Sequence, residues 1–459
     1  MDGQDLTAAE TELVRRFALN PYFDYQSMTE LKRSLAKRLG AETGFARWRQ
    51  LIPREKFPDA DRVEATPILS LRTAAQQSSV CVDVAASGIA FEIRPPKVIG
   101  DGDHHVMRNT SRAVYLTRLS NARIRGGSDI IHAKGSAIVD VEELELVKAR
   151  EFSDVNWSTI DFDPSVFFCD PEAWVAWMLV PAEDRLELER AYSLAGPNAM
   201  VFGHWMGEYL PKYVMASMTG CLPPVPIVID SNMPNSHRQA LELLAPDGVD
   251  IIERPIFSTT CVRELWVGSN LGFPEITKRW DPYASDPAVY APILTEMACR
   301  LERAIPQRRG PDKVYLSRKA LRRRKLVNAS AIEEIAREAG FVIAHPQDLS
   351  FAEQFRLVRD ASFVLGPDGS AMFLCFFNRP GTRLCILNHT HTEGLPTLTG
   401  LLSEISLDVT VLTGPIVRQD ENHLHFSDYE IDVDQFRNFL AEWLEGSSAE
   451  RKQADSAVR

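Results

Sequence analysis

The chain has 459 residues. At roughly 150 residues per domain this is about three domain equivalents or two large ones, which excludes a single small binding module. With 45% hydrophobic and 25% charged residues, the composition is that of a globular protein and not of a disordered scaffold. The net charge of −12 argues against a general affinity for nucleic acid or an anionic membrane, because neutralising those surfaces requires excess Lys and Arg.

The compartment is indicated by the N-terminus, the cysteines and the apolar runs. The first residues are acidic and lack the apolar stretch of a signal peptide. Seven cysteines without a CxxC pair suit reduced thiols better than a disulfide framework or a zinc site. The longest apolar runs, residues 174–180 and 371–377, fall far short of the ~18 residues that suggest a membrane span. We therefore expect a cytoplasmic protein without a membrane span, a surface compatible with peripheral membrane association, and no nucleic-acid partner.

The first 200 residues are predicted as two regions. Residues 1–70 have apolar positions at helical spacing and are expected to form a helical N-terminal segment. Residues 71–200 change to short β-rich stretches separated by Gly, Asp and Asn turn signals, which predicts a β-rich lead-in region with a small antiparallel sheet.

From residue 201 onward strands and helices alternate. We expect residues 201–285 to form an N-terminal Rossmann-like half, 286–306 a linking helix, 307–445 a C-terminal Rossmann-like domain and 446–459 a disordered tail. Consecutive βα units predict a parallel, doubly wound sheet, whose ligands bind beyond the carboxyl ends of the strands.

Helix boundaries in the last domain are well signalled. Ser330 with Glu333, and Ser350 with Glu353, fit the capping box, in which a side chain and the backbone satisfy each other's free donors. Gly340 stands where a glycine would end the first of these helices.

The strongest charge feature is the run from residue 308 to residue 325. Its nine basic residues and single acid give it a charge of +8, so the rest of the chain carries −20. Most such runs are solvated surfaces. Here, however, Ser317 and Arg318 fall at the carboxyl end of the predicted strand KVYLS, where a doubly wound domain binds its ligand. Because a guanidinium group matches phosphate oxygens two at a time, the run predicts a phosphate-bearing ligand.

A glycine-containing turn, LGPDGSA at residues 365–371, joins a predicted strand to a helix. Glycines allow the backbone to approach a ligand closely, and free N–H groups at a helix start favour a diphosphate. Ordinary βα turns have the same pattern. The turn matches neither the dinucleotide-binding fingerprint nor the P-loop, which disfavours both of those classes.

The segment GHWMGEYLP places His204 and Glu208 one helical turn apart. Such a pair could take a proton from a hydroxyl group, although a lone His/Glu pair is more often structural. His423 and His425 alternate like residues of an exposed strand and are also expected to be structural. Asp-x-Asp triplets occur by chance in a chain with 63 acidic residues, so we predict no metal site from those at 101–103, 161–163 and 432–434.

Over about residues 110–390 the sequence resembles glycosyltransferase family 61, the DUF563-type proteins that include capsular polysaccharide enzymes. The segment VFGHWMGEYLPKY looks like the family's H-W-x-x-E-x-L-P segment. The most specific piece is VYLSRKALRRRKLVN followed by GFVIAHPQDLSFAEQFRLVRDASFVLGPDGSA. It is similar to the family's ordered set of a strand ending in SR, a basic run, an Asn and a G-x-x-G-[AS] turn.

The resemblance implies a GT-B-like α/β fold, with two Rossmann-like domains facing a cleft and a β-rich N-terminal region. It implies inverting, metal-independent transfer of a sugar from a nucleotide-sugar donor to a glycan or glycolipid acceptor in surface polysaccharide synthesis, with no cofactor besides that co-substrate. His204 or Glu208 would be the catalytic base. An acidic residue nearer the N-terminus is a further candidate for that role. The donor would be bound by Ser317, Arg318, Arg322, Arg323, Arg324, Lys325, Asn328, Gly366, Asp368, Gly369 and Ser370.

Two positions depart from the family pattern. Asp368 stands where members usually have His, and Ala329 where an acidic residue often follows the Asn. If that His donates to phosphate, Asp368 would repel the donor. The alternative is therefore a non-catalytic sugar-nucleotide or glycan-binding partner in a polysaccharide synthesis complex. A third hypothesis is another GT-B-like transferase, such as a pyruvyl transferase, which would bind phosphoenolpyruvate at the basic site.

Overall fold

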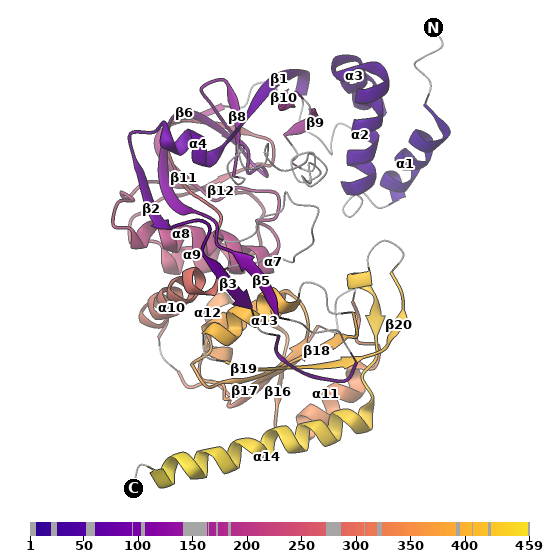
Figure 1. The fold of residues 1–459 in the computed structure, drawn as a ribbon, viewed down its shortest axis with the longest axis vertical. Helices are drawn as coiled ribbons and strands as arrows, with labels where there is room; N and C mark the ends of the chain where they lie inside the picture. Colours follow the sequence, from indigo (N-terminus) through magenta and orange to yellow (C-terminus); the bar gives the residue numbers. More distant parts are fainter. Residues whose placement is uncertain are drawn as a thin grey trace. The chain divides into compact units, whose positions relative to one another are not determined.

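The chain divides into two compact units (Figure 1). Unit 1 contains Met1–Ile89, Ser111–Pro234 and Ala245–Tyr283, and unit 2 contains Ala90–Thr110, Asn235–Leu244 and Ala284–Arg459. Each unit contains helices and a sheet, which confirms the α/β class. The computed structural model describes residues 6–19, 25–51, 60–93, 95–101, 106–140, 163, 165–170, 173–181, 185–271, 286–306, 308–318, 324–391, 395–405, 407–420 and 424–457.

Unit 1 begins with the helices α1 (Ala8–Leu19), α2 (Tyr25–Leu39) and α3 (Ala41–Leu51). Leu35 and Trp48 are buried and belong to one apolar cluster with Phe167. The helical N-terminal segment is therefore present, but the residues at its end form strand β1 (Ala60–Ser70) instead.

The described strands of unit 1 form one eleven-stranded sheet. Their order is β13-β12-β11-β14-β6-β7-β8-β1-β10-β9, with β2 paired to β6. Much of the β-rich region joins this large sheet, because β6 pairs with β14 in antiparallel register, while the strands at residues 90–93 and 107–110 pair separately. The remaining strands are β2 (Cys81–Ala85), β6 (Val114–Arg125), β7 (Ile131–Ala133), β8 (Ser136–Val139), β9 (Val166–Asp170), β10 (Val175–Pro181), β11 (Arg185–Ser193), β12 (Ile227–Asp230), β13 (Ile251–Arg254) and β14 (Thr259–Gly268).

Strands β11 to β14 have the order of the first four strands of a doubly wound sheet. They are parallel, and their spatial order, β13-β12-β11-β14, is 3-2-1-4 when counted along the chain. The order reverses between β11 and β14, so a ligand site is expected beyond the carboxyl ends of these two strands. A half that starts at residue 201 leaves out β11. The first part of β11 alternates between exposed and half-buried residues, which is the pattern of an antiparallel strand.

Unit 2 contains a six-stranded parallel sheet. Its order is β16-β15-β17-β18-β19-β4, which counted from β15 is 2-1-3-4-5, the flavodoxin-like order, with β4 added at the edge. The switch point lies between β15 and β17. The strands are β4 (Lys97–Ile99), β15 (Lys313–Leu316), β16 (Val342–Ala344), β17 (Phe363–Pro367), β18 (Arg383–His389) and β19 (Asp408–Gly414).

Helices cover both faces of this sheet (Figure 1). One face packs against α11 (Ala329–Glu338) and α14 (Val433–Ala457), which join Tyr315 and Trp443 in one apolar cluster. The drawn view places α12 (Phe351–Arg359) and α13 (Leu395–Glu404) on the other face. Helix α14 continues to Ala457, so residues 446–457 of the segment expected as a disordered tail are helical.

Segments far apart in the chain complete unit 2. Helix α9 (Asn235–Leu244) packs against α10 (Pro287–Ala304) and α12. The helix expected near 286–306 is thus present as α10, and the Asp286 side chain caps it by accepting from the Ala288 N–H. Two small antiparallel sheets pair β3 (Ala90–Ile93) with β5 (Met107–Thr110) and β20 (Ile416–Arg418) with β21 (Asp428–Tyr429).

One of the two predicted capping boxes forms. Ser350 and Glu353 make both of its hydrogen bonds at the start of α12. The box at Ser330 is wrong, because the N-cap of α11 is Asn328, two residues before Ser330, and Glu333 bonds to Ser317 instead. Gly340 follows α11 with a φ of +87°, a left-handed conformation that glycine adopts without strain.

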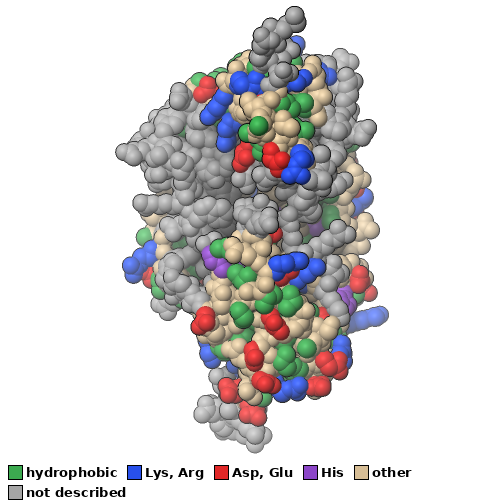
Figure 2. All heavy atoms as spheres, turned by 90° about the vertical axis from the view of Figure 1, so that its right-hand side faces the viewer, with side chains coloured by type: hydrophobic (Ala, Val, Ile, Leu, Met, Phe, Trp, Pro, Cys, Tyr) green, Lys and Arg blue, Asp and Glu red, His purple; other side chains and the backbone are tan. Residues whose placement is uncertain are grey.

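Charge is mixed on the face drawn in Figure 2, where acidic and basic side chains lie interspersed on the described surface. Among the helices that the structure describes, none is both long and apolar enough to cross a membrane.

Candidate functional site

The switch point of unit 2 brings together residues from the basic run and the glycine turn. Strand β15 leads directly into Ser317 and Arg318, and its neighbour β17 ends just before Asp368 and Gly369. The sequence predicted both segments as ligand-binding. The parallel pairing of the two strands places them at the same sheet edge, where ligands of doubly wound domains bind.

Asp368 holds two arginines at this edge. Arg318 Nη1 donates to the backbone carbonyl of Asp368, and Arg324 Nη1 donates to Asp368 Oδ2. The ion pair is largely buried, with the Arg324 side chain 13% and the Asp368 side chain 9% exposed. Gly369 has no side chain, and a Cβ there would collide with the Arg318 guanidinium. The missing side chain at Gly369 therefore leaves room for the Arg318 guanidinium.

The three charges keep a net value of +1. Burial, and to a lesser extent Arg324, lower the pKa of Arg318 to about 10, so it remains charged at neutral pH. Burial alone would raise the pKa of Asp368, but Arg324, His425 and Arg318 together hold it below its usual value. Asp368 is therefore ionised and neutralises one guanidinium, which leaves one positive charge for an anionic ligand.

Several residues predicted to bind the nucleotide-sugar donor make contacts within the fold. Ser317 Oγ donates to Glu333 Oε1 at 2.6 Å in a buried hydrogen bond, and Asn328 Nδ2 donates to the Ile431 carbonyl at 2.6 Å. A Cβ on Gly366 would stand 2.6 Å from the Leu316 carbonyl, so this glycine is required for the spacing of β15 and β17. These contacts explain the residues without a ligand.

The other predicted residues of this group differ in position. Lys325 is exposed, and its backbone N–H donates to Asp428 Oδ1 at 2.8 Å. Ser370 begins the 3-10 helix η5 (Ser370–Phe377) beside the arginines' turn. Arg322 and Arg323 lie outside the described residues.

Two histidines beside Asp368 were not predicted as site residues. His389 ends β18, and His425 lies on the 3-10 turn η6 (Leu424–Phe426), which corrects the strand expected there. The two rings are 6.5 Å apart, and burial lowers the pKa of His425 to about 4. His389 could have been found from the sequence, because it ends the strand next to β17. His425 has no such signal.

Replacing Ser317 by Ala tests its structural assignment. We expect the variant to lose about 1–3 kcal/mol of unfolding free energy, because the buried Glu333 carboxylate loses a charge-assisted hydrogen bond. Nucleotide affinity should stay unchanged. Urea unfolding and a calorimetric titration measure the two quantities. Weaker nucleotide binding with normal stability would return Ser317 to the ligand site.

In unit 1, His204 and Glu208 are brought together at an irregular turn. His204 ends the short helix α7 (Phe202–His204), and a π-helical turn, η3 (Trp205–Tyr209), follows before α8 (Leu210–Met218). Pro211 cannot donate a backbone hydrogen bond, which favours such a local widening of the helix. His204 Nδ1 contacts Glu208 Oε1, so the predicted pair forms.

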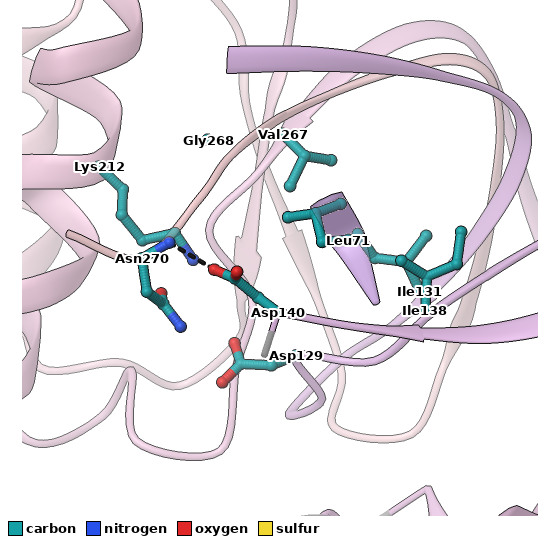
Figure 3. A pocket seen from close by; sticks show the side chains of 9 residues that line it. All are labelled: Leu71, Asp129, Ile131, Ile138, Asp140, Lys212, Val267, Gly268 and Asn270. Carbon is teal, nitrogen blue, oxygen red and sulfur yellow. Dashed lines mark hydrogen bonds between the residues drawn. The ribbon is translucent and has the colours of Figure 1, made fainter. Parts of the chain in front are cut away.

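The next turn of α8 lines a small pocket, drawn in Figure 3. Lys212 borders it together with Asp129, Asp140 and Asn270. The wall includes Gly268, the last residue of β14, so the pocket lies at the switch point of unit 1. Asp140 is held by Arg112 Nη2 at 2.7 Å and by the backbone N–H of Asn270. Sequence reasoning did not find Asp129, which comes from a turn of the β-rich region.

Within the described ranges, no group of three or more His, Cys, Asp or Glu side chains is placed to hold a metal ion. Residues 102, 103, 161 and 162 of the Asp-x-Asp triplets lie outside those ranges.

Comparison with known proteins gives one family match. Residues 202–385 match the model of the family described as Glycosyltransferase 61. The match spans less than half of the chain, and it includes the π-helical turn, the basic run and the Asp368 turn. It supports the resemblance to this family. No curated protein matches the sequence.

Proposed function

We propose that the protein is a glycosyltransferase of the DUF563 type. It moves a sugar from a nucleotide-sugar donor to a glycan or glycolipid acceptor with inversion at the anomeric carbon. The acceptor belongs to surface polysaccharide synthesis of the capsular kind. The reaction is metal-independent and uses no cofactor besides the donor. The two units act as the Rossmann-like domains of a GT-B arrangement, and the protein works in the cytoplasm.

The observation that carries the proposal is the pair Arg318 and Arg324 at the switch point of unit 2, inside the matched segment. Inverting transfer displaces a diphosphate, so positive charge must face the leaving oxygens. The guanidinium groups are fixed by Asp368 before any ligand arrives. Such preorganised charge stabilises a developing anion without reorganisation during the reaction.

The contacts of Asp368 help to choose between an enzyme and a non-catalytic binding partner. A free carboxylate at this position would repel the donor and favour a binding partner without activity. In unit 2, however, Asp368 is paired with Arg324 and accepts from Arg318 through its carbonyl. It therefore orients cations, and this favours the enzyme over the inactive partner.

The function is tested on the full chain by calorimetric titration with UDP, GDP and CMP, followed by nucleotide release from the corresponding sugar nucleotides. We expect one nucleotide to bind and its sugar nucleotide to be turned over. Binding without turnover would support the non-catalytic partner. Competition by phosphoenolpyruvate, with no nucleotide bound, would support the pyruvyl transferase.

A further inference from the structure

The side chain of Asp129 lines the small pocket described in unit 1 (Figure 3). The Asp129 side chain is exposed to solvent and borders the pocket. Asp129 Oδ1 and the Tyr209 hydroxyl both lie where a Cβ on Gly196 would stand, so this glycine leaves room for them. Gly196 comes shortly after β11, and the pocket wall includes the end of β14. Asp129 is therefore at the crevice where a doubly wound half binds its ligand.

Two buried carboxylates fix the backbone on either side of Asp129. Asp230 accepts from the Gly127 N–H at 2.6 Å and from the Gly196 N–H at 3.0 Å. Asp163 accepts from the Ser128 hydroxyl at 2.8 Å and from the Asp129 N–H at 3.2 Å. Burying carboxylates is costly unless their hydrogen bonds are made, and here those bonds hold the turn that presents Asp129.

The Asp129 carboxylate itself receives no hydrogen bond from any residue in the described ranges. The backbone of Asp129 is held in place while its carboxylate oxygens stay available at the edge of a pocket, an arrangement that suits contact with a ligand. Structural carboxylates such as Asp163 and Asp230 are arranged in the opposite way, with their oxygens already bonded.

The electrostatic surroundings give Asp129 the affinity for protons that a base requires. Desolvation raises the pKa of Asp129 to about 7. Lys212 opposes this shift, while the charges of Asp163, Glu208 and Asp230 add to it. The Tyr209 hydroxyl also faces the group, and burial raises its own pKa, so it stays neutral. A carboxyl group that titrates near neutral pH can accept and release a proton readily.

Unlike the Asp129 carboxylate, the Glu208 carboxylate has a side-chain partner. Its Oε1 contacts His204 Nδ1 one turn away, so the two predicted bases are engaged with each other. Glu208 acts on Asp129 through its charge. Asp140, the other acid among the described lining residues, is bonded to Arg112 and to the Asn270 N–H, so the open carboxylate among them is that of Asp129.

We infer that Asp129 is the general base of the proposed reaction, an inference that rests on the proposed function. Its carboxylate takes the proton of the acceptor hydroxyl while the acceptor oxygen bonds to the anomeric carbon. The bond from that carbon to the diphosphate oxygen breaks, and its electron pair leaves with the nucleoside diphosphate. Protonated Asp129 then returns its proton to water.

The test uses the full chain, the sugar nucleotide that the wild type turns over, and water as the acceptor, so the natural acceptor is not required. Asp129→Asn should lower kcat about 10²–10⁴-fold and leave KM for the donor within about threefold. Asp129→Glu should recover part of the rate. Asp247→Asn, an exposed acid of the same unit, is the matched control and should keep the wild-type rate.

Stability separates a base from a structural carboxylate. A carboxyl group whose pKa is raised on folding binds more protons in the folded state, so stability falls as the pH rises through that pKa. At pH 8 Asp129→Asn should therefore have a Tm equal to or above that of the wild type, although its activity is lost. A lower Tm would assign Asp129 a structural role and overturn the inference.

The last measurement is the pH dependence of kcat/KM in the wild type and in Glu208→Gln. The wild-type kcat/KM should decline below about pH 7, and Glu208→Gln should move this decline to lower pH, because it removes a neighbouring negative charge. Loss of kcat in Glu208→Gln or His204→Ala, with an active Asp129→Asn, would overturn the inference and leave the proposed function standing. A wild type without turnover of any sugar nucleotide would overturn both.

Discussion

Replacing Arg318 by Ala should reduce kcat/KM for the sugar nucleotide about 10²–10³-fold, which is the usual cost of removing one preorganised donor from a developing anion. Arg318 is oriented by the Asp368 carbonyl and packs against Gly369, so no neighbouring side chain can take its place without rebuilding the turn. Arg318→Lys should lose less but still fall below the wild type, because an ammonium group cannot make the two-pronged contact with phosphate. Nucleotide release and calorimetric titration measure the two effects.

The matched control is Arg309→Ala. Arg309 belongs to the same basic run but is exposed, so its removal changes the net charge by the same amount without touching the turn. We expect wild-type kinetics in this variant. Equal losses in both variants would mean that the basic run acts through its overall charge, and unchanged kinetics in Arg318→Ala would remove this residue from the site.

The sequence predicts the sheet of unit 2 well because its strands are buried and its turns follow local rules. The apolar run ending in Ser317 and the Ser350 capping box are signals within a few residues, and both appear as expected. Unit 1 is harder. Strand β11 is central in the sheet but half-exposed at its start, and β6 joins β14 across more than a hundred residues. Such long-range pairing leaves no local pattern.

The candidate site residues also differ in whether a local sequence pattern or only the fold reveals them. The sequence singles out Arg318, Asp368 and the His204–Glu208 pair as candidates, because each lies in a motif with a recognisable position on its element, and the structure shows their contacts. It gives no sign that Ser317 has a buried partner, since only packing brings its hydroxyl to Glu333 on α11. It leaves an acidic residue nearer the N-terminus open as the base but does not single out Asp129. That residue lies in an unremarkable turn, and its surroundings come from β11, α8 and β12, which only the fold brings together.

Asp368 gives the sharpest contrast between the effect expected from sequence and the effect expected from structure. If its carboxylate repels the donor, Asp368→Asn should tighten nucleotide binding. The structure predicts weaker binding, because the carboxylate holds Arg324 in place. Removing the charge should also cost about 3–5 kcal/mol of unfolding free energy at neutral pH, since it leaves a buried guanidinium uncompensated. Asp360→Asn, which breaks a more exposed pair with Arg379, should cost no more than about 1 kcal/mol.

The pH dependence of that loss identifies its cause. The pKa of Asp368 is lowered on folding, so its contribution to stability is complete above the unfolded pKa of about 3.9 and disappears as the pH falls through the folded value. Urea unfolding of the wild type and of Asp368→Asn should therefore give a large difference at pH 7 that shrinks below about pH 4. A difference independent of pH would point to packing instead. Asp368→His, the residue usual in the family, should unfold more easily at pH 7, because an imidazole cannot neutralise Arg324.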